Sequence, residues 1–136
     1  MARELLAAQY MYTFEWDKGI EQFELLRRYK TESIGTYQAL SWCYIFKDEP
    51  DKAGEVLQSY LKTVGENGFI RANLGVVYCI LGDLDKAKKE IDIGDSLNPH
   101  ETINFKRFYL LCTRDFPALE LLYKDWEASP LYGYPI

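Results

Sequence analysis

An internal repeat with a period of 34 residues constrains the fold of this chain more than any other feature of its sequence. Four columns keep one residue type in three successive units. These columns are Leu6, Leu40 and Leu74; Tyr10, Tyr44 and Tyr78; Asp17, Asp51 and Asp85; and Lys18, Lys52 and Lys86. A tandem unit of this length buries its apolar side only against its neighbours. The period therefore predicts a stack of similar units.

Each unit contains two helical stretches separated by a tight turn. In the third unit, Leu74 and Tyr78 share one helical face, and a second apolar series follows the break at Gly82. Asp83 is placed to cap that second helix, and Pro50 falls in the first turn of the equivalent helix one unit earlier. The pattern predicts two antiparallel helices per unit.

Further columns keep chemistry rather than identity. Two of them hold only small residues, namely Ala7, Ser41 and Gly75, and Gly19, Ala53 and Ala87. Helices joined by a short turn cross closely, and a bulky side chain at the crossing would hold their backbones apart. Large apolar residues in another column are expected to fill the space beside the crossing; they are Phe23, Leu57 and Ile91.

The third unit resembles the tetratricopeptide repeat (TPR). The residues that carry the resemblance are Leu74, Gly75, Tyr78, Gly82, Ala87 and Pro99, while Arg71 stands at the family's tryptophan position. The first two units follow the same motif more loosely. The resemblance implies an all-α fold, a right-handed superhelical α-solenoid of antiparallel helix pairs in a single domain. Its parts are expected at residues 1–33, 34–67, 68–98 and 99–127, followed by a tail at 128–136.

The last helix pair is expected to depart from the strict repeat. Asn98 is expected to cap its first helix and Pro99 to be the first helical residue. The alignment that best fits the family places the fourth unit three residues short of the 34-residue period. It puts Lys106 in the first small column, Tyr109 in the tyrosine column and Ala118 in the second small column. Terminal repeats are commonly atypical because they have only one neighbour.

Composition and charge argue against several classes of protein. Sixteen basic and 21 acidic residues give a formal net charge of −5, which repels a polyanion and disfavours nucleic-acid binding. The lysines of LDKAKKEI at 84–91 alternate with carboxylates, so they are expected to form a solvated helix face. No apolar run is long enough for a membrane span. Three scattered cysteines and the lack of a secretory signal favour a cytoplasmic, reducing setting.

No constellation of residues indicates catalysis. His100 is the only histidine, no cysteine pair has metal-ligand spacing, and no glycine-rich loop ends in Lys and Ser or Thr. The carboxylates are accounted for by helix surfaces and caps. The sequence therefore predicts a protein that is not an enzyme and that uses no catalytic residue, metal or cofactor.

The resemblance implies recognition of another polypeptide. In this family the first helices of successive pairs line a concave groove for extended peptides or helices. Matching positions predict an apolar groove lined by Leu5, Tyr12, Gln38, Trp42, Phe46, Asn73 and Val76. Trp42 and Phe46 are the expected hot spots. The predicted function is therefore a protein–protein interaction scaffold or adaptor with a peptide or protein partner.

Chaperone-binding members of the family clamp a terminal carboxylate with lysine, asparagine and arginine. The matching positions here hold Glu4, Ala8, Ala39, Phe69 and Asn73, so this clamp is not expected. An alternative function stays open, that of a structural or regulatory segment of a larger signalling or enzymatic protein. Such a segment would dock a neighbouring domain or form a homodimer through its terminal repeat or through the apolar sequence SPLYGYPI at 129–136.

Overall fold

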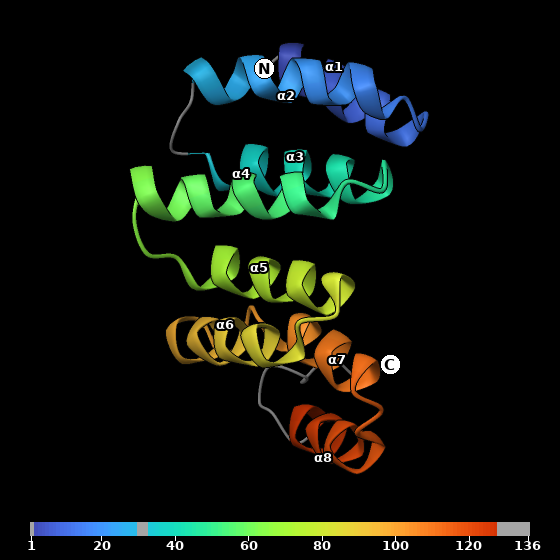
Figure 1. Cartoon of the computed structure of the whole chain (residues 1–136), viewed down its shortest axis with the longest axis vertical. Coiled ribbons are helices and arrows are strands. Elements are labelled where there is room, and N and C mark those ends of the chain that lie inside the picture. The colour runs from blue at the N-terminus through green and yellow to red at the C-terminus, as the bar shows by residue number, and fades with distance from the viewer. Residues whose placement is uncertain (1, 30–32, 128–136) are drawn as a thin grey trace.

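The computed structural model describes residues 2–29 and 33–127, and its ordered elements are all helices (Figure 1). No strand occurs among the residues in these two ranges. The helices are α1 (Ala2–Tyr12), α2 (Trp16–Tyr29), α3 (Ile34–Phe46), α4 (Pro50–Thr63), α5 (Gly68–Leu81), α6 (Leu84–Leu97), α7 (Ile103–Cys112) and α8 (Phe116–Glu127). The prediction of an all-α fold built from helix pairs is confirmed.

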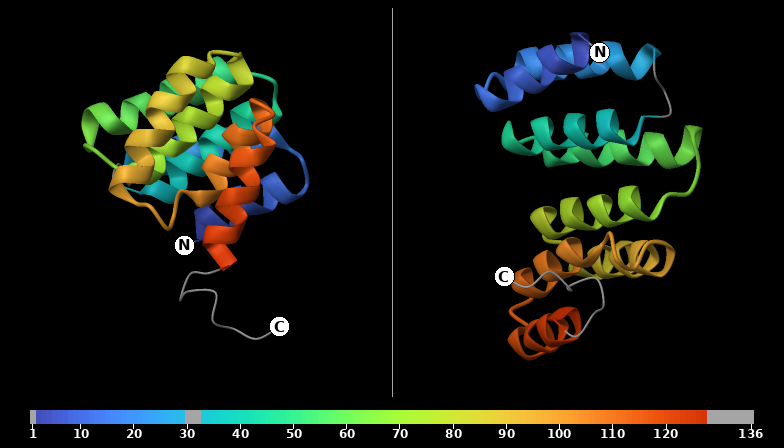
Figure 2. Two further views of the ribbon diagram at one scale, coloured as in Figure 1. Left: turned by 90° about the horizontal axis from the view of Figure 1, so that it is seen from below. Right: turned by 180° about the vertical axis from the view of Figure 1, so that it is seen from behind.

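The helix pairs stack in chain order. Each pair is formed by consecutive helices, and the second helix of a pair packs against the first helix of the next, as α2 does on α3 and α4 on α5. First helices of adjacent pairs also touch: α5 contacts both α3 and α7. The pair α1–α2 therefore lies at one end of the stack and α8 at the other, as Figures 1 and 2 show from three sides.

The turn inside each pair has one recurring geometry. Its central residue adopts the left-handed conformation, with φ of 60° at Phe14, 64° at Asp48, 83° at Gly82 and 56° at Arg114. The next residue donates its N–H to a carbonyl five residues earlier; these bonds are Glu15 to Tyr10, Glu49 to Tyr44, Asp83 to Tyr78 and Asp115 to Leu110. This is the Schellman helix ending, for which glycine is the favoured residue. Only the third turn has that glycine.

The repeated tyrosines and lysines contact one another within each of the first three pairs. The lysine ammonium lies over the tyrosine ring at 5.6 Å for Lys18 and Tyr10, 5.9 Å for Lys52 and Tyr44, and 5.7 Å for Lys86 and Tyr78. Such cation–π contacts contribute about 0.5–1 kcal/mol each at exposed sites. Two of the four invariant columns thus encode one contact that joins the two helices of a pair.

The small columns lie where the helices cross. All six residues are buried, and a methyl group placed on Gly75 would approach Ile91 Cγ1 to 2.4 Å. Gly68 and Gly94 meet at a second close crossing between α5 and α6. One apolar core runs from α1 to α5 and includes the fully buried Leu40 and Leu57, and a second, smaller cluster of Cys79, Ala87 and Ile91 joins α5 to α6.

The predicted cap of α6 is present, and α5 has a cap that was not predicted. The Asp83 carboxylate accepts a hydrogen bond from the backbone N–H of Lys86 at 3.2 Å, and Asn67 caps α5 through the N–H of Ile70 at 3.0 Å. Pro50 is the first residue of α4. These contacts satisfy N–H groups that have no partner within the helix.

The start of the fourth pair differs from the prediction. Asn98 ends α6 and Pro99 lies in a turn, so the expected cap and first helical residue are wrong, and α7 begins only at Ile103. The reason is Thr102, which is fully buried and donates its hydroxyl to the Asn98 carbonyl at 2.9 Å. This bond holds residues 98–102 as a separate turn.

The expected frame of the fourth pair is also shifted. The Schellman bond puts Leu110 rather than Tyr109 at the tyrosine position, and by the same count Leu119 replaces Ala118. Lys106 is not at the crossing, because its ammonium pairs with Asp95 of α6 at 2.8 Å.

A different contact joins the helices of this last pair. The Arg107 guanidinium lies 4.4 Å from the centre of the Tyr123 ring, where the third pair has Gly75 against Ile91. A large side chain thus replaces a small one at this position of the pair.

Candidate functional site

The structure separates the predicted groove residues into two groups. Leu5, Tyr12 and Phe46 are exposed, while Gln38 and Trp42 are partly buried. The remaining two, Asn73 and Val76, are each only 3% exposed on α5. They face the packed interior between neighbouring helices, so their expected contact with a partner is wrong. The accessible part of the predicted groove therefore lies on α1 and α3.

Four aromatic rings from the first two pairs form one continuous stack, which we call the aromatic cluster. Phe14 packs its edge against Trp16, with ring centres 5.5 Å apart. Trp16 stacks on Phe46 at 5.0 Å with an interplanar angle of 23°, and Phe46 stacks on Trp42 at 5.7 Å and 29°. Phe46 is still 55% exposed and Phe14 is 76% exposed. The cluster therefore presents ring surface to the surroundings.

The aromatic cluster borders an apolar pocket of about 370 Å³. Its lining residues are Ala8, Met11, Tyr12, Phe14, Trp16 and Phe46. None of these side chains carries a charge, and the only side-chain polar groups are the Tyr12 hydroxyl and the Trp16 indole N–H. A pocket with this lining favours apolar or aromatic groups with few hydrogen-bonding atoms.

The local fold positions each ring. Phe14 occupies the left-handed residue of the first turn, Trp16 is the first residue of α2, and Phe46 is the last of α3. Lys47 and Asp17 form an ion pair of 2.6 Å that ties the end of α3 to the start of α2. The hydrogen bond to the Asp17 carboxylate raises the pKa of the Lys47 ammonium. This pair lines a separate, smaller hollow that shares Phe14 and Trp16 with the aromatic pocket.

Two members of the cluster were not predicted from the sequence. Phe14 and Trp16 lie in and directly after a turn, whereas the prediction considered only first helices. One signal in the repeat pointed to them. The turn column holds Asp48 and Gly82 in the next two units, so a phenylalanine there is anomalous. A bulky residue at φ of 60° is conformationally unfavourable, and such positions concentrate at functional sites.

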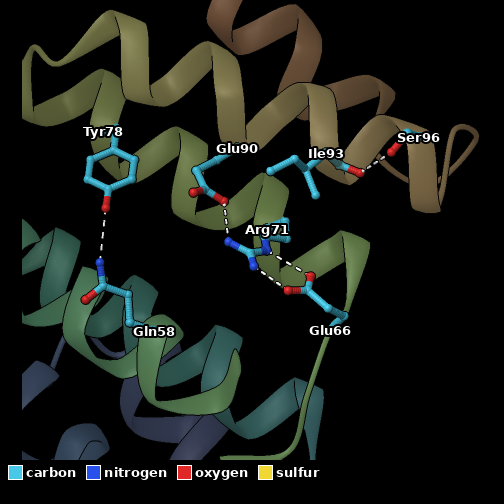
Figure 3. Close-up of polar contacts among 7 residues, drawn as sticks. All are labelled: Gln58, Glu66, Arg71, Tyr78, Glu90, Ile93 and Ser96. Atoms are coloured by element: carbon cyan, nitrogen blue, oxygen red, sulfur yellow. Dashed lines mark hydrogen bonds and ion pairs between the residues drawn. The ribbon is translucent and has the colours of Figure 1, made fainter. Parts of the chain in front are cut away.

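A second concavity of about 660 Å³ lies between α4, α5 and α6, and most of its lining residues have polar side chains. Figure 3 shows its central feature, Arg71, bonded to two carboxylates. Arg71 Nε donates to Glu66 at 2.9 Å, and its Nη1 donates to Glu90 at 3.0 Å. Gln58 donates to the Tyr78 hydroxyl across the same space at 3.0 Å. Arg71 already has two anionic partners, so its guanidinium is not free to bind a ligand. The aromatic pocket is therefore the better candidate for a binding site.

Two of the three cysteines are buried, and the lone histidine is exposed. Burial raises the pKa of Cys43 to about 11 and that of Cys79 to about 12, so both are protonated thiols at neutral pH. His100 is exposed in the turn before α7. Within residues 2–29 and 33–127, no three His, Cys, Asp or Glu side chains are placed to hold a metal ion together.

Two of the three lysines of α6 pair with carboxylates of the same helix or of its N-cap. Lys88 contacts Asp92 at 2.6 Å, and Lys86 lies near Asp83 at 3.5 Å as well as over Tyr78. Both lysines are well exposed, as expected for a solvated helix face. The segment 84–91 therefore has little uncompensated positive charge.

Comparisons with known proteins give no family assignment. No protein-family model matches the sequence, and a search of curated proteins finds no match either. No described helix combines the length and apolar character that crossing a membrane requires.

Proposed function

We propose that this protein is a TPR-like interaction module whose aromatic cluster binds a polypeptide partner. In this proposal the helix pairs form a right-handed superhelical solenoid, and the partner's apolar side chains enter the pocket beside Phe46. The observation that carries the proposal is the exposed ring surface of Phe14 and Phe46 around an uncharged pocket. Exposed aromatic side chains around a preformed pocket are typical hot spots of protein interfaces.

Burial of the exposed rings supplies the driving force. Removing apolar surface from water contributes about 25 cal/mol per Å², and a fully buried phenylalanine contributes roughly 1.5–3 kcal/mol. Phe14 is mostly exposed and Phe46 is about half exposed, so a partner that covers them gains binding free energy. The rings are already stacked, which lowers the entropy lost when they are immobilised on binding.

The proposed partner is held by its side chains rather than by a terminal carboxylate. Asn73 is the one clamp residue type present at the matching positions; it is buried and donates its amide to the Phe69 carbonyl at 2.9 Å. Glu4 stands where the clamp would need a cation. A peptide with an amidated C-terminus should therefore bind as well as the free acid.

A peptide-display selection on the full chain, followed by fluorescence polarisation with the selected peptides, tests this function. Phe46→Ser and Phe14→Gly should each weaken binding about tenfold or more. Phe14→Gly also keeps the turn, because glycine suits φ of 60°. Relief of the left-handed strain, about 1–2 kcal/mol, offsets the lost ring pair of about 0.5–1.5 kcal/mol.

Phe116→Ser is the matched control. This phenylalanine is 59% exposed at the start of α8, far along the stack from the aromatic cluster. Its substitution should leave peptide affinity unchanged. Equal loss in all three variants, or no loss at Phe46, would count against the aromatic cluster as the binding site. Circular dichroism of each variant verifies that the helices are retained.

A further inference from the structure

We propose that residues 129–136 of a second copy occupy the aromatic pocket, so that copies of this protein associate head to tail. This inference rests on the proposed function, since it requires the pocket to bind a polypeptide. It goes further by assigning the occupant. The segment lies outside the described residues, so the inference uses only its sequence and the place where α8 ends.

The segment and the pocket match in chemistry. The sequence SPLYGYPI contains no charged side chain, and the pocket lining contains none either. Pro130 and Pro135 restrict the backbone to extended conformations, which aromatic grooves bind at low entropic cost. Tyr132 and Tyr134 supply rings that can stack on Phe14 and Phe46 while their hydroxyls stay at the wet rim.

Distance makes binding within one chain unfavourable. From α3, which carries Phe46, the stack passes to α5, α7 and α8, and each step between packed helices is about 8–10 Å. The 12 residues of α8 add about 18 Å of helix, and Figures 1 and 2 place this helix at the opposite end of the stack from α1. The direct separation is thus roughly 30 Å or more, and the direct line passes through packed helices.

The segment has too little length for that path. Residues 128–136 cover roughly 30 Å at about 3.5 Å per residue when fully extended, with nothing left to enter the pocket. A path around the helices is longer still. The pocket of a second copy is free of this limit, so the contact is intermolecular.

Such a contact joins two different surfaces, and each copy carries both. An interface of this heterologous kind gives either a reciprocal dimer or a longer chain of copies. It also predicts complementation: a copy with an intact pocket and a copy with an intact segment should still join once, even when each is defective in the other part.

Sedimentation velocity on full-length variants tests this prediction. The pocket variant is Phe14→Gly with Phe46→Ser, and the segment variant is Tyr132→Ser with Tyr134→Ser. Wild type should sediment faster as its concentration rises, and each variant alone should remain a monomer. An equimolar mixture of the two variants should form dimers and nothing larger. Phe116→Ser should behave as wild type.

Several outcomes overturn the inference. Wild type that stays monomeric at every concentration, a segment variant that still associates, or a mixture that fails to dimerise would each do so. Fluorescence polarisation with selected peptides separates this failure from failure of the proposed function. A pocket that binds selected peptides in a monomeric wild type refutes the assigned occupant alone, whereas a pocket that binds no peptide refutes both.

Discussion

Two glycines at helix crossings show how strongly a single residue depends on the space around it. A methyl group on Gly19 would lie 3.6 Å from Cys43 Sγ and 3.7 Å from Tyr10 Cβ, which are ordinary contact distances. On Gly75 the same group would lie 2.4 Å from Ile91 Cγ1 and 3.1 Å from the Ala87 carbonyl oxygen. The first site accepts alanine and the second does not.

Gly19→Ala should therefore stabilise the protein and Gly75→Ala should destabilise it. Alanine improves helix propensity by about 0.8–1.0 kcal/mol at Gly19. Overpacking at Gly75 costs about 1–3 kcal/mol, which exceeds the same propensity gain. Urea denaturation followed by circular dichroism measures both changes. Shifts of the same sign in the two variants would show that space at the crossing does not decide the outcome.

The residues of the aromatic cluster were only half predictable. Trp42 and Phe46 follow from the resemblance to the tetratricopeptide repeat, which assigns their positions in the first helix of the second unit to the groove. Phe14 and Trp16 join them through the turn geometry and the contact between α2 and α3, which no pattern within one helix encodes. Asn73 and Val76 were predicted to line the groove, but they are buried by contacts between helices that the repeat pattern does not encode. Their helix α5 packs against four others, so the face that they share is buried.

At the scale of helices, Arg71 links three parts of the chain. It stands on α5 and bonds Glu66 in the preceding loop and Glu90 on α6 (Figure 3). The hydrogen bond from Arg71 lowers the pKa of Glu66 below 4.5. A carboxyl group whose pKa is lower in the folded state stabilises the protein above its unfolded pKa, and the effect is lost as the pH falls through the folded pKa.

Arg71→Gln should therefore destabilise the protein at pH 7, and the difference from wild type should shrink as the pH falls below about 4.5. Glu90 is mostly buried and would lose its cation, so the loss at neutral pH should exceed the 0–1 kcal/mol typical of surface pairs. Urea titrations at several pH values measure the difference in unfolding free energy.

Lys88→Gln is the control for this experiment, because it removes an exposed pair within α6. Its effect should stay below about 0.5 kcal/mol at every pH. A gap between Arg71→Gln and wild type that does not depend on pH would show that the carboxylates are not the source of the stabilisation.

The helices themselves were predictable, and the fourth pair shows the limit. In the first three pairs, the tyrosine and lysine columns together form one recurring contact, and the small residues lie buried where the helices cross. In the fourth pair these columns are missing, so no repeated residue determined the frame. The Asn98-Pro99 pattern predicted a helix start that Thr102 delays. The contact of Arg107 with Tyr123 replaces the usual crossing.

Across the whole molecule, burial is uneven along the stack. The helix α5 has nine buried residues and packs against several other helices. The helix α7 has no buried residue, and α8 ends the described part of the stack. In stacked repeats each unit contacts only its neighbours, so local stability follows local burial. The fourth pair should therefore open more readily than the centre.

Hydrogen exchange measured by mass spectrometry under native conditions should show this gradient directly. Amides of α5 should exchange at least about tenfold more slowly than those of α7 and α8, a difference of about 1.4 kcal/mol in opening free energy. Exchange in α1 should be intermediate, because Ala7 alone is buried there but α2 covers one side. If all helices exchanged at one rate, the stack would open as a single cooperative unit, and the burial of α5 would not decide local stability.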